Sequence, residues 1–196
     1  MDPRRPLVVL DINGVLIHRV HKSNLKNNKK STFVTPNGYH VFVRPNAKGF
    51  LTFLFKHFDV AVWTCMNKQN AQFVLERLMT RKQKDSLKFV YTQKECDKSG
   101  LENPLFYKRM SKLPFTNKTN NVVFIDDSPH KVSYNPPYTA IHPKTYTNIE
   151  SDNALVNIRK LFEAYLNETS NITMSTFLKK QEPLSIFARI VRFFFR

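Results

Sequence analysis

Short segments that are apolar throughout alternate along this chain with segments whose apolar residues recur at helical spacing. Leu7–Leu10 and Val122–Ile125 are continuously apolar, and residues 58–63 are apolar except for Asp59, which is typical of strands buried on both faces. Residues 47–55 carry Ala, Phe and Leu on one helical stripe, as in a helix that packs on a sheet. The alternation predicts an α/β fold with a central parallel sheet and right-handed crossovers.

The remaining segments extend this pattern. A second helix is predicted from a cap at Asn67 to residues 81–84, and a closing helix is predicted after a cap at Asp152. Residues 18–30 are polar, basic and without a period, so we expect a loop or flap there, with a solvated insertion as the alternative. The other expected features are strands at Tyr39–Val43, 87–92 and 138–142, an irregular excursion at 96–104, and a short amphipathic segment at 108–113.

The domain boundaries follow from a change in composition near the C-terminus. We place one domain at residues 1–166 and a linker at 167–182, where Asn, Thr, Ser and Lys dominate. Residues 183–196 are predicted to form a basic amphipathic helix with arginines on one stripe and a wide apolar surface.

Polar side chains follow three of the predicted core strands where each strand ends. Asp11 follows the first strand, Thr64 the second, and Asp126 and Asp127 the third. Ligands of open α/β sheets bind outside the carboxyl ends of the strands, so these groups are placed where chemistry happens. An Asp that only caps a turn is the alternative for Asp11. Carboxylates at the ends of apolar runs are costly unless a cation or strong donors meet them, and a divalent metal would do so.

Net charge and cysteine content indicate which partners and which compartment to expect. The net charge is +16, from 31 Lys and Arg against 15 Asp and Glu, so the surface attracts anions such as phosphorylated peptides, nucleic acid or anionic lipid. The two cysteines form no disulfide framework, which favours an intracellular, reducing compartment such as the nucleus or cytoplasm. The apolar run after Pro6 is too short for a signal peptide core or a membrane span.

Five segments taken together resemble the haloacid-dehalogenase-like phosphatases, and most closely the branch that contains the carboxy-terminal-domain phosphatases of RNA polymerase II. In order, these segments are DINGV at 11–15, VFVRP at 41–45, DVAVWT at 59–64, KRMSKL at 108–113 and IDDSP at 125–129. The resemblance covers residues 6–165. It implies a Rossmann-like, three-layer α/β/α fold with a central parallel sheet and a small flap or insert.

The resemblance also implies a phosphoryl transfer through an aspartyl-phosphate, with Mg²⁺ as the cofactor. Asp11 would be the nucleophile and a metal ligand, the backbone carbonyl of Asn13 a second ligand, and Asp127 a third, with Asp126 beside it. Carboxylates suit this role because a hard, oxygen-ligated cation screens the repulsion between an oxygen nucleophile and a phosphate dianion. Two further residues, Thr64 and Lys108, would hold the phosphoryl oxygens, and Arg44 is a weaker candidate for substrate contact.

Asn13 departs from the family pattern. Active members carry a second Asp two residues after the nucleophile, which protonates the leaving alcohol and deprotonates the attacking water. An amide can do neither, and loss of a positioned general acid and base typically costs ~10²–10⁴ in rate. Metal binding should survive, because the expected ligand at Asn13 is its backbone carbonyl.

Three functions remain open on these residues. The first is a Mg²⁺-dependent phosphatase that acts on phosphoserine or phosphothreonine in a protein, slowed by Asn13. The second is a catalytically degenerate member that binds phosphopeptides or serves as a scaffold, as relatives in mitochondrial protein import do. A nucleic-acid binder ranks lowest, because only charge suggests it. The helix at 183–196 would dock on the core or a partner, or lie in the interface of an anionic membrane.

Overall fold

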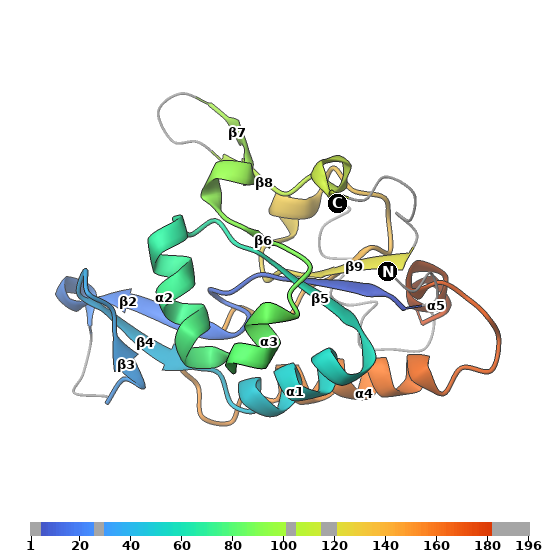
Figure 1. Ribbon diagram of the computed structural model, residues 1–196, viewed down its shortest axis with the longest axis horizontal. Helices are drawn as coiled ribbons and strands as arrows, with labels where there is room; N and C mark the ends of the chain where they lie inside the picture. Colours follow the sequence, from blue (N-terminus) through green and yellow to red (C-terminus); the bar gives the residue numbers. More distant parts are fainter. Residues whose placement is uncertain (1–4, 26–29, 101–104, 115–120, 182–196) are drawn as a thin grey trace.

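A five-stranded parallel sheet forms the centre of the molecule. The computed structural model describes residues 5–25, 30–100, 105–114 and 121–181 (Figure 1). The sheet has the order β10-β9-β1-β5-β6, and every neighbouring pair is parallel. Its strands are β1 (Leu7–Leu10), β5 (Asp59–Trp63), β6 (Val90–Tyr91), β9 (Val122–Ile125) and β10 (Ala140–Ile141). The α/β fold with a central parallel sheet is therefore confirmed.

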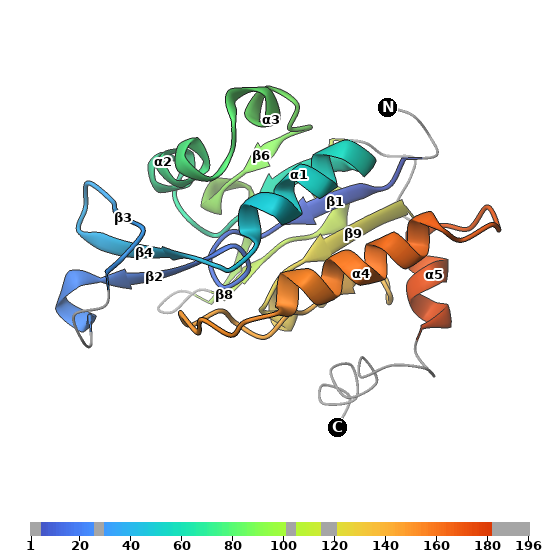
Figure 2. The same cartoon turned by 90° about the horizontal axis from the view of Figure 1, so that it is seen from below.

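The two faces of the sheet are covered differently. Val8 and Leu10 belong to one hydrophobic cluster, and Leu7 and Val9 to the other, as alternation along a strand requires. The first cluster receives the helices, and Figure 2 shows two of them, α1 and α4, lying along the sheet. These helices are α1 (Ala47–His57), α2 (Lys68–Leu78), α4 (Ala154–Leu166) and α5 (Met174–Lys180). The second cluster is covered instead by the short 3₁₀ turns η3 (Met110–Lys112) and η5 (Pro129–Val132) and by Cys96.

A small antiparallel sheet projects from the end of the central sheet where β1 stops (Figures 1 and 2). It consists of β2 (Ile17–His21), β4 (Tyr39–Val43) and β3 (Phe33–Val34), in the order β2-β4-β3. The turn η1 (Lys22–Asn24) follows β2 in the chain. We call these three strands the flap. The sequence predicts a loop or flap at residues 18–30, and residues 18–21 form part of β2, so a flap is found there in place of a loop. Residues 18–21 are only partly buried, so the strand shows no apolar alternation that the sequence could reveal.

Two connections also differ from the sequence prediction. The second helix stops at Leu78, and residues 81–84 belong to a separate helix, α3 (Arg81–Asp85), which starts with a capping box between Thr80 and Gln83. The excursion predicted at 96–104 contains an ordered strand, β7 (Asp97–Ser99), paired with β8 (Leu105–Tyr107) and preceded by the turn η2 (Gln93–Glu95). Elements as short as α3, β7 and β8 leave little hydrophobic periodicity in the sequence.

The segment expected to be a linker is part of the packed structure. Within residues 167–182, helix α5 buries Met174 completely and leaves Phe177 only 2% exposed. The backbone N–H of Met174 donates to the side-chain oxygen of Asn121, the residue before β9, at 3.1 Å. The predicted linker is therefore corrected to an ordered helix, while the helix predicted at 183–196 lies outside the described residues. None of the described helices is long and apolar enough to cross a membrane.

Candidate active site

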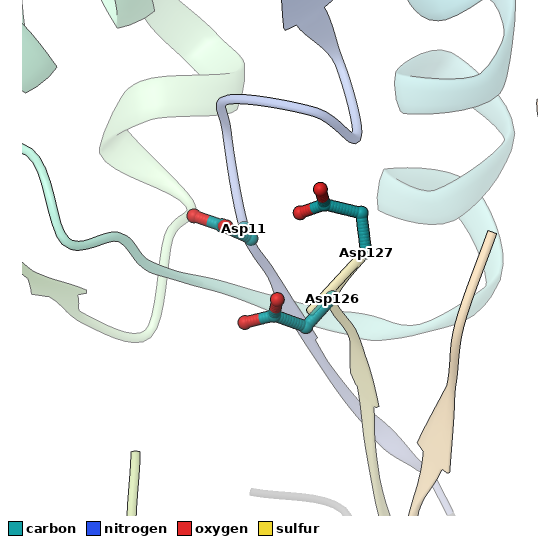
Figure 3. Close-up of side chains that lie close together, drawn as sticks. All are labelled: Asp11, Asp126 and Asp127. Carbon is teal, nitrogen blue, oxygen red and sulfur yellow. The ribbon is translucent and has the colours of Figure 1, made fainter. Parts of the chain in front are cut away.

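The parallel ladder continues one residue past the strands and sets two acids side by side. The backbone N–H of Asp11 donates to the carbonyl of Ile125 at 2.9 Å, and that of Asp126 donates to Ile141 at 3.2 Å. Asp127 follows directly, and Figure 3 shows all three carboxylates gathered at this end of the sheet. Ligand oxygens of Asp11, Asp126 and Asp127 lie within 4.8 Å of one another. The structure thus brings together the acids that the sequence placed at strand ends.

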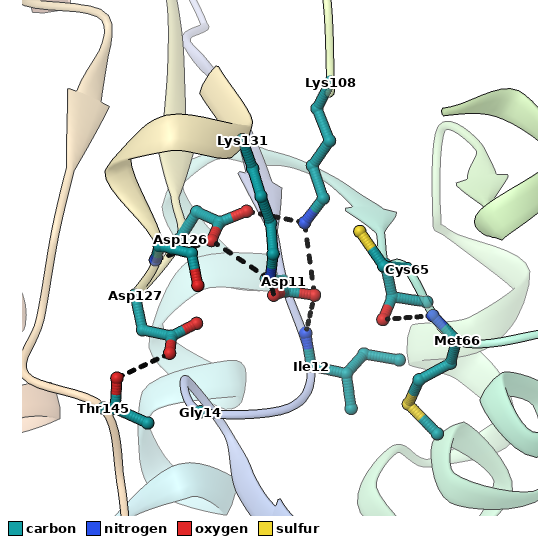
Figure 4. Close-up of polar contacts among 12 residues, drawn as sticks. Asp11, Ile12, Gly14, Cys65, Met66, Lys108, Asp126, Asp127, Lys131 and Thr145 are labelled. Carbon is teal, nitrogen blue, oxygen red and sulfur yellow. Dashed lines mark hydrogen bonds and ion pairs between the residues drawn. The ribbon is translucent and has the colours of Figure 1, made fainter. Parts of the chain in front are cut away.

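Two lysines lie among these acids (Figure 4). The Lys108 ammonium is 2.6 Å from Asp126 Oδ2 and 3.2 Å from Asp11 Oδ1. The Lys131 ammonium is 3.2 Å from Asp11 Oδ2 and 3.7 Å from Asp126 Oδ1. Asp11, Asp126 and Lys108 are almost completely buried, so these charges are screened little by water.

The lysines decide the protonation state of the predicted nucleophile. Burial alone would favour the neutral acid, but Lys108 and then Lys131 outweigh burial and hold the pKa of Asp11 below its ordinary value. Asp11 Oδ1 also accepts the backbone N–H of Ile12 at 2.8 Å. Asp11 is therefore an ionised carboxylate with a fixed orientation, as a nucleophile must be.

Lys108 is held in place by backbone contacts rather than by a regular element. Its N–H donates to the carbonyl of Lys131 at 2.6 Å, which joins the two lysine-bearing segments. The side chain of Asn135 donates to the carbonyl of Lys108 at 2.9 Å and accepts from the N–H of Met110 at 2.7 Å. Asn135 thus fixes the short segment that carries Lys108.

Asp127 has one occupied and one unoccupied carboxylate oxygen. Its Oδ2 accepts from the Thr145 hydroxyl at 2.7 Å, whereas its Oδ1 is buried and without a hydrogen-bond partner in the described part of the chain. Burial raises the pKa of Asp127 despite the hydrogen bond from Thr145. A buried carboxylate oxygen without a donor is a site that a cation would stabilise, so the donor set fits a hard divalent metal such as Mg²⁺.

The turn after Asp11 passes close to Asp127. Gly14 has a φ of +87°, and a Cβ at this position would lie only 2.7 Å or less from the Asp127 carboxylate atoms. A side chain there would both strain the backbone and displace the carboxylate. Asn13, which precedes Gly14, has a buried side-chain oxygen without a described hydrogen-bond partner.

Arg44 corrects the prediction of a substrate contact. Its guanidinium is fully buried and forms a two-pronged ion pair with Asp152, at 2.7 and 2.8 Å. Its other contacts are to the carbonyls of Gly14, Val15 and Lys144. All of its donor nitrogens are thereby engaged, so Arg44 holds the turn after Asp11 against the segment that carries Thr145 and is not available to substrate.

Thr64 lies directly after β5, next to β1 in the sheet. The register pairs Leu10 with Val62, which sets Thr64 level with Ile12, one residue beyond Asp11. Its backbone N–H donates to Tyr91 at 3.0 Å, and its hydroxyl accepts from the N–H of Met66 at 3.3 Å. The hydroxyl is thus at the correct edge of the sheet, and its contact with a phosphoryl group stays a prediction.

Lys131 and Asn135 are site residues that sequence reasoning missed. Lys131 follows Asp127 by four residues, and the 3₁₀ turn η5 returns its side chain over the carboxylates. The chain has 31 Lys and Arg, and nothing in the sequence around Lys131 distinguishes it from the others. Only the prediction of a helical turn directly after Asp126 and Asp127 would have pointed to it. From the sequence, Asn135 is only a turn residue before two prolines.

The parallel sheet, the flap and the aspartates at the strand ends define a haloacid-dehalogenase-like phosphatase. Residues 6–173 match the family model of the NLI interacting factor-like phosphatases, which is most of the chain. The protein therefore belongs to this family.

Relatives and solved structures agree with that assignment. A CTD phosphatase-like protein, 355R of Invertebrate iridescent virus 3, is 25% identical over 186 residues, which are 83% of this chain and 97% of the relative. A protein of Schizosaccharomyces pombe that contains an FCP1 homology domain is 24% identical over 187 residues, with coverages of 86% and 74%.

Two structures of the RNA polymerase II CTD phosphatase Fcp1 share the fold, and one of them is the fission yeast protein bound to beryllium fluoride. Each has a TM-score of 0.54 and 19% identity and covers 93% of this chain. This chain spans 56% and 54% of those two chains, about half of their length.

Proposed function

We propose that the protein is a Mg²⁺-dependent phosphatase that hydrolyses phosphoserine or phosphothreonine in a protein through an aspartyl-phosphate on Asp11. The observation that carries the proposal is the state of Asp11. It is an oriented, ionised carboxylate at the end of β1, set between two ammonium groups and beside a carboxylate with a free oxygen.

The first chemical step follows from these contacts. A carboxylate oxygen of Asp11 forms a bond to phosphorus while the bond between phosphorus and the seryl or threonyl oxygen breaks. Lys108, and Thr64 with its hydroxyl, would hold the phosphoryl oxygens, and Lys131 supplies a second positive charge on the opposite side of Asp11. Water then attacks phosphorus, releases phosphate and regenerates the Asp11 carboxylate.

Asp11, Asp127 and the backbone carbonyl of Asn13 would hold the magnesium ion, with Asp126 beside them. When bound, Mg²⁺ would screen the repulsion between the carboxylate and the phosphate dianion. Asp126 already accepts from Lys108 at 2.6 Å and from the backbone N–H of Ser128 at 2.9 Å, so its role is to position Lys108.

Asn13 limits proton transfer in both steps. The seryl or threonyl oxygen leaves as an alkoxide unless a proton reaches it, and the amide has none of suitable acidity to give. This observation favours a second candidate function, a degenerate family member that binds phosphorylated proteins without turning them over. The similarity to CTD phosphatase-like proteins and the charge of +16 support a phosphorylated protein as the ligand in either case.

Hydrolysis of an aryl phosphate, with and without magnesium, tests the proposal directly. The expected result is slow turnover that requires the metal and is abolished in Asp11→Asn, which loses the nucleophile and one charged ligand. Turnover retained by Asp11→Asn would refute the aspartyl-phosphate. Absence of turnover in the unaltered chain, together with measurable binding of a phosphoserine peptide, would favour the degenerate member instead.

A further inference from the structure

The two cysteines lie in contact beside the candidate site. Cys65 follows Thr64 after β5, and Cys96 follows the turn η2, 31 residues later. Their sulfur atoms are 3.8 Å apart. Cys96 is buried in the cluster on the face opposite the helices, and Cys65 is half-buried against the same cluster.

Backbone hydrogen bonds on both sides of Cys65 hold the two segments together. The N–H of Thr64 donates to the carbonyl of Tyr91 at 3.0 Å, and the N–H of Gln93 donates to the carbonyl of Met66 at 2.9 Å. The turn that leads to Cys96 is itself fixed by the carboxylate of Glu95, which accepts the Thr92 N–H at 2.7 Å. The proximity of the two sulfurs is therefore built into the fold rather than left to mobile side chains.

The surroundings also favour a thiolate in the pair. The hydrogen bond with the Cys65 thiol lowers the pKa of Cys96 to about 7 against the opposing effect of burial. The same thiol contact, with burial, raises the pKa of Cys65. Cys96 is therefore the sulfur that ionises first, with Cys65 as its hydrogen-bond donor, and the thiolate is the form that attacks oxidants.

We propose that Cys65 and Cys96 are an oxidative modification site, which a peroxide converts into a reversible disulfide. Formation of a disulfide of about 2.05 Å requires the sulfurs, now 3.8 Å apart, to approach by roughly 1.8 Å. Rotation of the two side chains, with a small shift of the backbone, supplies this movement.

The chemistry balances with hydrogen peroxide as the oxidant. When the Cys65 thiol passes its proton to the Cys96 thiolate, the half-buried sulfur of Cys65 carries the negative charge and attacks a peroxide oxygen, which breaks the O–O bond. The departing hydroxide takes a proton from solvent and becomes water, and a sulfenic acid remains on Cys65. The sulfur of Cys96 then attacks the sulfur of Cys65, forms the S–S bond and expels the hydroxyl as a second water. Two thiols lose two electrons and two protons, and the peroxide is reduced to two waters.

The disulfide would act on the candidate site through the turn after β5. The hydroxyl of Thr64 accepts from the N–H of Met66, so the turn spans Cys65 and moves with it. Cys65 also lies near Lys108, and a negative charge on Cys65 raises the pKa of Lys108 (Figure 4). On the other side, Lys112 donates to the carbonyl of Glu95 at 3.3 Å, which ties the segment before Cys96 to the segment that carries Lys108. This consequence for activity rests on the proposed phosphatase function, whereas the disulfide itself does not.

Peptide mapping of the full chain tests the modification. After brief treatment with hydrogen peroxide and alkylation of free thiols, we expect a cross-linked peptide pair that contains Cys65 and Cys96 and separates on reduction with dithiothreitol. Cys96→Ser should give no such pair. Alkylation of both cysteines after a treatment that fully oxidises glutathione would overturn the proposal, as would cross-links found only between two chains.

Turnover of an aryl phosphate then tests the effect on the site. Displacement of a positioning group by about 1 Å can cost about 10²-fold in rate, so we expect oxidation to lower turnover by about tenfold or more and dithiothreitol to restore it. Cys96→Ser should keep its turnover through the same treatment. An equal loss of turnover in Cys96→Ser, or unchanged turnover in the cross-linked chain, would overturn the inference that the disulfide controls the site. If the reduced chain has no turnover, binding of inorganic phosphate replaces it as the readout, and the peptide map still decides the modification.

Discussion

At the scale of single residues, Asn13 separates the candidate site from a complete phosphatase site. Two lysines lie among three carboxylates, one of which is Asp11, the proposed nucleophile, so positioning and electrostatic stabilisation are provided. Proton transfer is the one contribution without a residue. The chemistry of the leaving group should therefore decide how fast the protein works.

Asn13→Asp should restore this proton transfer. We expect turnover of an alkyl phosphate to rise by roughly 10²-fold or more, because a poor leaving group needs a proton. An aryl phosphate, whose phenolate leaves readily, should gain much less. Steady-state rates on one substrate of each kind, with Asn13→Ala as a control that cannot transfer a proton, measure the difference. Equal gains on both substrates would contradict the role given to this position.

Lys131→Met should weaken binding of the phosphoryl group. Hydrogen bonds to charged groups contribute about 1.5–3 kcal/mol, which corresponds to a loss of roughly tenfold or more in kcat/KM. Lys88→Met is the matched control, because this partly exposed lysine pairs with Asp59 at the start of β5, away from the three acids. Inhibition by inorganic phosphate should weaken in parallel. If the two variants behave alike, Lys131 is a surface charge without a role in the site.

At the scale of elements, the sequence predicted those that are apolar and periodic. Leu7–Leu10 and Val122–Ile125 were found as strands because both of their faces are buried, and the acids that follow them were placed correctly for the same reason. The sequence does not reveal β2, because four of its five residues are only partly buried, and it predicts a linker in place of α5, because only two residues of α5 are buried. Arg44 was misread because its partner, Asp152, is 108 residues away.

The pair of Arg44 and Asp152 joins the turn after Asp11 to the start of α4. Asp152→Asn should lower the free energy of unfolding by about 3 kcal/mol at neutral pH, because it leaves a buried guanidinium without its counter-charge. Asp85→Asn, which breaks the exposed pair with Arg81, is the control and should change stability by less than about 1 kcal/mol. Urea unfolding of the three proteins measures both effects.

The same pair gives a pH dependence with a definite sign. Burial opposes ionisation of Asp152, but the hydrogen bonds from Arg44 outweigh it and lower the pKa of Asp152 below 3.8 in the folded protein. The stabilisation is therefore complete above 3.8 and is lost only as the pH falls through the lower, folded value. The stability difference between the unaltered chain and Asp152→Asn should persist to about pH 4 and shrink below it. A difference that disappears already near neutral pH would contradict this origin.

At the scale of the whole molecule, the chain has a net charge of +16, whereas acids outnumber lysines in the site. Such a field raises the rate at which anionic substrates arrive, and salt screens it within about 8 Å at physiological ionic strength. For a phosphopeptide with acidic flanking residues, kcat/KM should fall steeply as sodium chloride is added. A phosphopeptide with alanine flanks should lose less. Parallel salt dependences for the two peptides would assign the effect to the site rather than to the surface.

The balance of charge at the end of β1 couples the binding of two different ligands. Three carboxylates face two ammonium groups there, so the site without ligands carries one net negative charge if all five groups are ionised. A divalent cation reverses that sign, and a phosphate dianion restores it, so each ligand prepares the site for the other. Thermodynamic reciprocity then requires that Mg²⁺ tighten phosphate binding by the same factor by which phosphate tightens Mg²⁺ binding. Calorimetric titration of each ligand in the presence and absence of the other would measure that factor twice.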